Sequence, residues 1–170
     1  MKKIRTMLCW MLCVSLLLAA GGVLAEEAQT RVFRLGTSAF TIDIPESVEE
    51  MELPEEAAQY GMVAYLCDVD AGLFMDIYQY DKESHPISLS EFVEQEAAQN
   101  NGTDVMPVGM MSGFVVGWFT ISGTPDNPDS PIFYLVLEDE KSFIEIGFSM
   151  TGEPGGEEAK AIMASLKQAG

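Results

Sequence analysis

The chain has 170 residues, 48% of them hydrophobic, and its 27 acidic residues against nine basic ones give a net charge of −18. This length and apolar content suffice for one domain with a sizeable core. The acidic balance repels nucleic acid and anionic lipid, so we expect no nucleic-acid partner, and it suits cationic partners or ions. A charge that only keeps the protein soluble is the more ordinary interpretation.

Residues 1–25 have the pattern of a secretory signal peptide. Basic residues at positions 2, 3 and 5 precede an apolar run, and small residues end at Ala25 before two acids. This order predicts export with cleavage after Ala25, which leaves a single domain over residues 26–170. A permanent anchor is the alternative, but the run is shorter than the roughly 20 residues that cross a bilayer. We therefore expect a secreted or extracytoplasmic protein with no membrane span after cleavage.

Cleavage changes both the charge and the cysteine content. It removes three basic residues and no acidic one, so the net charge becomes −21. It also leaves Cys67 as the sole cysteine, which excludes an internal disulfide, so the exported domain must rely on its core. Apolar neighbours at strand spacing predict that Cys67 is a buried thiol rather than a nucleophile.

The first half of the domain reads as strands around one hairpin. Alternation predicts strands at 31–36 and 40–44, followed by a helical turn at 55–60 that Gly61 closes. Two β-type runs, 62–69 and 73–80, are separated by a three-residue loop that ends at Gly72. Such a loop predicts a left-handed Gly72 and a register that pairs Val69 with Leu73. That register would place the following apolar residues on one face: Tyr65, Cys67, Val69, Leu73, Met75 and Ile77.

The second half begins and ends with a helix. A capping box from Ser88 to Glu91 opens a helix whose buried face should carry Leu89, Phe92, Val93 and Ala97. Strands are expected at 104–111, 114–121, 132–137 and 142–150, before a last helix from 157 to about 168. In the last strand Glu145, Gly147 and Ser149 alternate with core residues that should lie under this helix, namely Ile144, Ile146 and Phe148. The buried stripe of the helix itself should be Ala159, Ile162, Met163 and Leu166.

This order predicts an α+β fold, a mainly antiparallel sheet whose faces are covered by helices or loops. The chain resembles the PsbP-like family, small exported α/β/α sandwiches. The resemblance is carried by FTIDIP at 40–45, SLSEF at 88–92, GFVVGWF at 113–119 and SFIEIGFSM at 142–150. It implies a binding or assembly module without catalysis, and it carries over no functional residue.

Three aspartates, Asp68, Asp70 and Asp76, surround Gly72 and could supply oxygen ligands to calcium. Counted from Asp68, however, the fifth, sixth and twelfth positions lack the acid or amide, glycine and glutamate of an EF-hand loop. We therefore interpret the stretch as a hairpin tip without a specific metal site. Alternation in the expected register points Asp68 and Asp76 to one face, and Asp70 should accept hydrogen bonds from backbone amides within the turn.

His85 is the single histidine, so a histidine-based triad would have to use it. It precedes Pro86 in a loop, and no nucleophile motif accompanies it in the exported domain. One histidine and one cysteine are also too few for an ordinary zinc site. We expect an exposed loop histidine. A His85 buried beside two carboxylates in a deep pocket would instead favour an enzyme.

Two further ion-binding alternatives rest on short clusters. Thioethers for Cu(I) are offered by Met106, Met110 and Met111. We favour core packing for these methionines. Oxygen ligands for calcium are offered by Asp126, Asn127 and Asp129. We favour an ordinary acidic loop there.

The sequence thus predicts no catalytic, cofactor-binding or metal-binding residue and no cofactor. The expected function is a secreted, non-catalytic binding or assembly module whose partner at the cell envelope is a protein or small ligand, with a cationic one favoured by charge. The alternative is an exported enzyme that uses carboxylates or a bound metal ion.

Overall fold

The computed structural model describes residues 29–122, 131–150 and 153–169. Its strands and helices form in this order: β1 (Thr30–Arg34), β2 (Phe40–Pro45), β3 (Glu49–Glu50), α2 (Glu55–Gln59), β4 (Met62–Asp68), β5 (Leu73–Asp81), α3 (Leu89–Gln99), β6 (Thr103–Met111), β7 (Phe114–Ile121), β8 (Ile132–Glu138), β9 (Ser142–Met150), α4 (Glu153–Ala164) and β10 (Lys167–Gln168). Strands and helices thus fall close to the expected segments.

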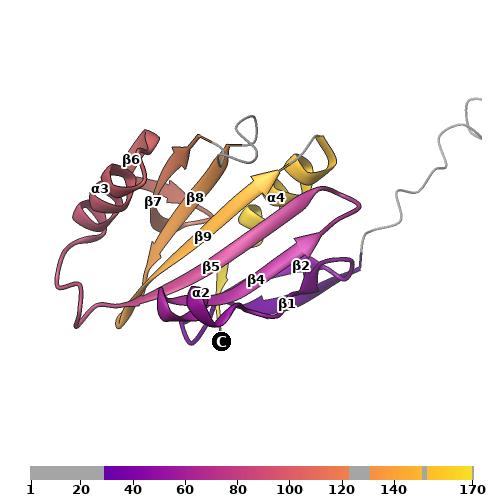
Figure 1. Cartoon of the computed structure of the whole chain (residues 1–170), viewed down its shortest axis with the longest axis horizontal. Helices are drawn as coiled ribbons and strands as arrows, with labels where there is room; N and C mark the ends of the chain where they lie inside the picture. Colours follow the sequence, from indigo (N-terminus) through magenta and orange to yellow (C-terminus); the bar gives the residue numbers. More distant parts are fainter. Residues whose placement is uncertain (1–28, 123–130, 151–152, 170) are drawn as a thin grey trace, which may run out of the picture.

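Two antiparallel sheets organise these elements. The large sheet has the strand order β3-β4-β5-β9-β8-β7-β6, and the small one has the order β1-β2-β10. Figure 1 shows the long strands β5 and β9 crossing the middle of the molecule, with α3 and α4 at opposite sides of the sheet. The predicted α+β class with a mainly antiparallel sheet is therefore confirmed.

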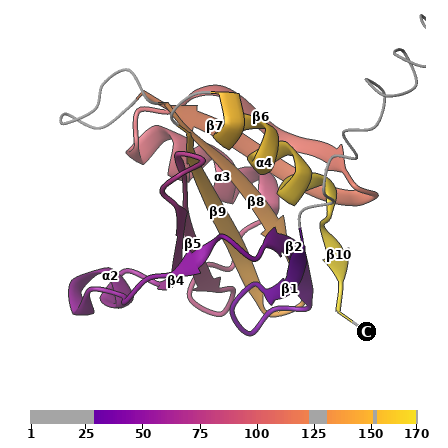
Figure 2. The ribbon, with the colours of Figure 1, turned by 90° about the vertical axis from the view of Figure 1, so that its right-hand side faces the viewer.

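The large sheet is covered unequally on its two faces. Figure 2 shows α4 and the small sheet on one face, with α3 on the other. The main core joins β2, β4, β5, β8 and β9 to α4 on the first face, whereas a smaller cluster lies beneath α3. Ile144, Ile146 and Phe148 belong to the main core together with Ala159 and Ile162 of α4, as predicted.

Helix α3 forms as the sequence predicts because its signals are local. The Ser88 hydroxyl accepts a hydrogen bond from the Glu91 amide, and the Glu91 carboxylate accepts one from the Ser88 amide at 2.9 Å. This reciprocal pair satisfies two of the amides that a helix N-terminus leaves without partners. The residues of α3 that are buried are the four expected ones: Leu89, Phe92, Val93 and Ala97.

The β4–β5 hairpin differs from the expected register by one residue. Asp68, not Val69, pairs with Leu73, so the loop spans four residues, 69–72. The slip turns β4 over: Leu66 faces the main core, whereas Tyr65 lies on the α3 side with Asp76. A shift of one residue exchanges the faces of a strand, and burial of Leu66 against the core decides which register wins.

The last helix also differs from the prediction. It begins at Glu153, before the expected start at residue 157, and ends at Ala164. The chain then extends, and Lys167 pairs with Thr41 in the short strand β10. The Ser165 hydroxyl accepts the Asp43 amide at 2.8 Å, which ties this exit to β2. Two-residue strands such as β3 and β10 carry no periodic pattern, so the sequence could not reveal them.

Gly72 has a φ of +70°, which confirms the left-handed position expected for it. A β-branched side chain is strained in this region. We expect Gly72→Val to reduce the free energy of unfolding by roughly 1–2 kcal/mol, measured by urea denaturation. Ala71→Val in the same loop is the matched control. Equal stability of the two variants would contradict the role given to Gly72.

Candidate functional site

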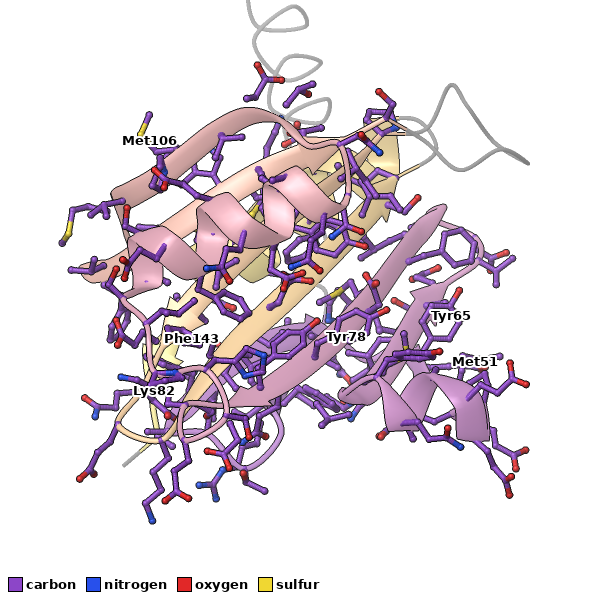
Figure 3. All side chains as sticks on the ribbon, turned by 60° about the vertical axis from the view of Figure 1, so that its left-hand side comes forward. Met51, Tyr65, Tyr78, Lys82, Met106 and Phe143 are labelled. Carbon is purple, nitrogen blue, oxygen red and sulfur yellow. The ribbon has the colours of Figure 1, made fainter. Side chains whose placement is uncertain are left out.

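The candidate site lies where α3 leaves its face of the large sheet uncovered. Helix α3 packs over β6, β7 and β8. Beyond it, β5 presents Asp76, Tyr78 and Tyr80 by alternation, and β9 presents Glu145 opposite Tyr78. Figure 3 shows Tyr78 on the face of the sheet that also carries α3. Polar and aromatic groups therefore meet at the edge of the helix.

Tyr78, Tyr80 and Glu145 line a pocket of about 510 Å³, which we call the tyrosine–acid pocket, and Asp76 lies beside it. Its volume lies within the roughly 300–1,000 Å³ of sites for small ligands. Its walls come from β5, β8, β9, α3 and three connecting segments. The lining residues are Tyr60, Tyr78, Tyr80, His85, Gln95, Glu96, Gln99, Asn100, Tyr134 and Glu145.

Gly147 allows the side chains of Asp76 and Tyr134, from two strands that are not adjacent, to meet beside this pocket. Asp76 on β5 and Tyr134 on β8 both pair with Gly147, which stands between them on β9. The Tyr134 hydroxyl donates to the Asp76 carboxylate across the glycine at 3.3 Å. A Cβ atom at Gly147 would overlap the Asp76 carboxylate and lie 2.7 Å from Tyr134 Cε1. The glycine is thus a condition for this contact.

Glu145 is the most unusual group of the site. It is only 4% exposed, and its Oε2 atom has no hydrogen-bond partner in the described part of the chain. Burial raises the pKa of Glu145 well above its ordinary value, and the nearby acids Glu96 and Asp76 raise it further. Burial of a carboxylate without a partner opposes its ionisation.

The other carboxyls of the site are shifted in the same direction. Burial raises the pKa of Asp76, although hydrogen bonds from Tyr134 and Tyr78 oppose the rise. Burial also raises the pKa of Glu96 on α3, against a lowering effect of His85. Three acids from three elements therefore lie in one weakly hydrated region. Burial there disfavours the ionised form of each carboxyl.

The tyrosines supply the aromatic walls. Tyr78 and Tyr80 stack with ring centroids 6.2 Å apart, and Tyr134 stacks on Phe119 at 5.1 Å. Burial raises the pKa of all three phenols, and neighbouring acids add to it. They are therefore neutral hydrogen-bonding groups with fixed ring faces.

His85 is half-buried rather than fully exposed, which corrects the expectation for this residue. Its ring packs edge-on against Tyr80 and Phe92, at centroid distances of 5.8 and 5.9 Å. Its Nδ1 atom is 3.1 Å from the Asp81 carbonyl oxygen. The residue lines the tyrosine–acid pocket together with Glu96 and Glu145. Folding of the loop against α3, which loop composition does not encode, accounts for its burial.

The three aspartates around Gly72 do not gather. Asp68 lies on the face of Leu66 and Asp76 on the opposite face, so the expected common face is wrong. Asp68, rather than Asp70, stabilises the turn by accepting the Ala71 amide at 2.9 Å. Hydrogen bonds from Ser47 and from that amide lower the pKa of Asp68. Over residues 29–122, 131–150 and 153–169, no three His, Cys, Asp or Glu side chains group closely enough to hold a metal ion.

The remaining sequence candidates lie outside this site. Cys67 is buried, as predicted. Met106 and Met110 are 43% and 66% exposed, so core packing is wrong for them, whereas Met111 packs against the main core. Figure 3 shows Met106 at the outer edge of the molecule. Edge strand β6 leaves these side chains without a covering layer. The loop with Asp126, Asn127 and Asp129 lies outside the described residues.

A larger pocket of about 750 Å³ lies at the same end of β5 but on the opposite face of the strand, lined by Gln79, Lys82 and Lys141 among others. The Lys82 ammonium of this pocket forms an ion pair with Glu138. In the described chain the tyrosine–acid pocket, by contrast, contains the buried Glu145, whose Oε2 atom has no hydrogen-bond partner, and a second carboxyl of raised pKa, Glu96. Such groups mark functional sites more often than volume does, so we place the candidate site there.

Sequence reasoning missed Glu145 because it stands at an alternate position of a strand, where a polar residue ordinarily faces solvent. The residues of SFIEIGFSM alternate between apolar and polar or small side chains, and other strands such as IFYLVLE are more apolar. No local signal therefore marks Glu145 as buried. The pairing of β9 between β5 and β8 encloses it.

Glu145 gives a testable dependence of stability on pH. A carboxyl whose pKa is raised by folding contributes most below its unfolded value, near 4.5, and this contribution is lost as the pH rises through the folded pKa. We expect Glu145→Gln to be more stable than wild type at pH 8 by on the order of 1 kcal/mol, about 3 °C in Tm. The difference should shrink towards pH 4.

Thermal unfolding between pH 4 and pH 8 measures this difference. Glu94→Gln, on the exposed side of α3, removes the same charge and serves as the control. Its stability should follow the wild-type pH profile. A constant offset between Glu145→Gln and wild type at every pH would contradict the assignment.

Comparisons with known proteins address the fold. No family model and no curated protein matches the chain. The solution structure of cyanobacterial PsbP from Synechocystis is similar with a TM-score of 0.57 and 9% identity, over 86% of this chain and 95% of that one. A crystal structure from Bacteroides thetaiotaomicron is similar with a TM-score of 0.56 and 14% identity, over 84% of this chain and 49% of the other. This chain thus spans about half the length of the Bacteroides chain. The likeness shows that the chain resembles the PsbP fold, and at these identities it shows the fold alone.

Proposed function

We propose that the protein is an exported, non-catalytic binding module that holds its ligand in the tyrosine–acid pocket. The observation that carries the proposal is Glu145, a buried residue that lines a pocket of ligand size and whose Oε2 atom has no hydrogen-bond partner among the described residues. Leaving such a group unsatisfied costs about 1–3 kcal/mol. A fold that retains this cost gains from it when a ligand supplies the missing partner.

Other features support binding rather than covalent chemistry. The described residues that line the pocket include no serine, threonine, cysteine or lysine that could act as a nucleophile. His85 contacts a backbone carbonyl and two aromatic rings instead of a hydroxyl or thiol. The PsbP-like fold is consistent with an assembly module, and the pattern of residues 1–25 supports export to the cell envelope. Among the described helices, none is long and apolar enough to cross a bilayer.

A second candidate function is an exported hydrolase that uses the carboxyls of the same pocket. The observation that favours it is the raised pKa of Glu145 beside Glu96 and the half-buried His85. A carboxyl kept protonated by burial next to a second carboxylate is the arrangement of a general acid. Loss of a measured hydrolytic activity in Glu145→Gln, with the fold intact, would favour this function over simple binding.

Capture of the ligand tests the binding function. The immobilised exported protein is incubated with an extract of its own envelope fraction, and small molecules that remain bound are identified by mass spectrometry. Tyr78→Ala alters the pocket, and Met110→Ser alters an exposed residue far from it. We expect a compound retained by wild type and by Met110→Ser but not by Tyr78→Ala. No retained compound, or equal retention by all three proteins, would contradict the proposal.

A further inference from the structure

A carboxyl group without a counter-charge lines the tyrosine–acid pocket. The described lining residues include no lysine or arginine that could neutralise Glu145. The charged groups that act on it, Glu96 and Asp76, are themselves acids. An isolated buried carboxylate is strongly disfavoured. A ligand that brings positive charge and N–H donors would therefore supply the counter-charge of Glu145 and the hydrogen bond that its Oε2 atom lacks.

The walls around this acid suit a cation with an apolar body. Tyr78 and Tyr80 present stacked rings from one strand, and Tyr134 presents a third ring from β8. Aromatic faces attract a cation within about 6 Å of the ring centroid, most strongly where water is excluded. Aliphatic carbon attached to the cation packs on the same rings.

Building on the proposed function, we propose that the ligand of the tyrosine–acid pocket carries a primary alkylammonium group, which donates hydrogen bonds to the Glu145 carboxylate and packs its alkyl chain against the tyrosines. The pocket volume of about 510 Å³ accommodates such a chain. A charge-assisted hydrogen bond of this kind is about twice as strong as a neutral one.

Other ligand classes fit these groups less well. An anion would meet Glu145, Glu96 and Asp76 in a protein of strongly negative charge. A quaternary ammonium has no N–H to satisfy the Glu145 acceptor. A neutral sugar could stack on the tyrosines but would leave the carboxylate charge uncompensated. A hard metal ion needs six or more oxygen ligands, and no group of three metal-ligating side chains occurs within the described chain.

The inference also predicts how affinity depends on pH. An ammonium group binds the ionised carboxylate, and burial raises the pKa of Glu145, so protonation of this carboxyl at low pH competes with binding. The other titratable groups that face it are Asp76, Tyr78 and Tyr80 on β5, Tyr134 on β8, Glu96 on α3 and His85 in the loop. Protonation of Glu96 or Asp76 as the pH falls weakens cation binding in the same direction. Affinity should therefore increase from pH 5 to pH 8, and the part due to Glu145 is the difference from Glu145→Gln.

Isothermal titration calorimetry with three small probes tests the inference on the exported protein at pH 8. The probes are n-butylamine, its neutral analogue n-butanol, and tetramethylammonium. We expect n-butylamine to bind at least about tenfold more tightly than either of the other two, a difference of about 1.4 kcal/mol. Glu145→Gln should abolish this preference, whereas Glu94→Gln should retain it. Circular dichroism verifies that both variants are folded.

The opposite outcomes separate this inference from the function on which it rests. Equal binding of n-butanol, tighter binding of tetramethylammonium, or unchanged n-butylamine affinity in Glu145→Gln would overturn the primary-ammonium ligand. The binding function would survive each of these results if a captured compound still depended on Tyr78. Glu96→Gln is the second variant, should Glu145→Gln fail to fold, and a loss of at least half of the preference is expected there because Glu96 acts electrostatically on the same site.

Discussion

Ile146→Asp is expected to destabilise the protein by on the order of 3 kcal/mol or more. Ile146 is 1% exposed and stands at the centre of β9, paired with Ile77 on one side and Leu135 on the other. All three belong to the main core beneath α4. An aspartate there would find no hydrogen-bond partner in the apolar side chains of the neighbouring strands. It would be buried either as a neutral acid or as an unpaired charge. Urea denaturation at neutral pH measures the loss.

Two controls separate burial of charge from general damage. Ile146→Val removes one methylene and should cost only about 1 kcal/mol. Val115→Asp introduces the same carboxylate at a side chain that is 53% exposed and should cost far less than Ile146→Asp. If Ile146→Asp melted within a degree or two of wild type, β9 would not lie in the centre of the core.

Gly147→Val is expected to cost about 2–3 kcal/mol, because overpacking a close-packed site forces neighbours out of their preferred positions. The new Cβ atom would overlap the Asp76 carboxylate and crowd the Tyr134 ring. The substitution should also break the 3.3 Å hydrogen bond from Tyr134 to Asp76. Denaturation measures the stability, and tyrosine resonances in an NMR spectrum report on the contact.

Gly156 supplies the matched control for this glycine. It lies in α4, and a Cβ atom there would have no neighbour within 4 Å. Gly156→Ala should stabilise the protein slightly, by about 0.5–1 kcal/mol, because alanine favours a helix. The double variant Gly147→Val with Asp76→Ala should recover part of the loss, since it removes the overlapping carboxylate. Purely additive effects of the two substitutions would show that Asp76 is not what the new side chain meets.

The two proposals place unequal demands on the same pocket. The binding function requires only the pocket and Glu145, whose Oε2 atom lacks a hydrogen-bond partner among the described residues. The primary-ammonium ligand requires in addition that charge, rather than shape, decides affinity. The pH dependence of the stability of Glu145→Gln provides an independent measure, because it reports the burial of this carboxyl without any ligand.

Local signals in the sequence were sufficient for α3 and for the inward face of β9. The N-terminal cap of α3 and its apolar stripe lie within a dozen consecutive residues, so no distant segment had to be known. Ile144, Ile146 and Phe148 alternate in an apolar strand, and their burial follows from that period. Gly72 was likewise recognised from the turn alone, because only a few loop geometries close a hairpin.

The site itself was decided by tertiary structure. The register of β4 and β5 depends on which face each strand buries, and one additional loop residue reverses the two faces of β4. Glu145 occupies a polar position of an alternating strand, which by itself predicts exposure to solvent. It is buried because β9 lies between β5 and β8, with α3 and the tyrosines of both neighbouring strands beside it. The sequence therefore determined α3 and the inward face of β9, whereas the pairing of distant strands, which periodicity does not encode, determined the face of β4 and the enclosure of an acid.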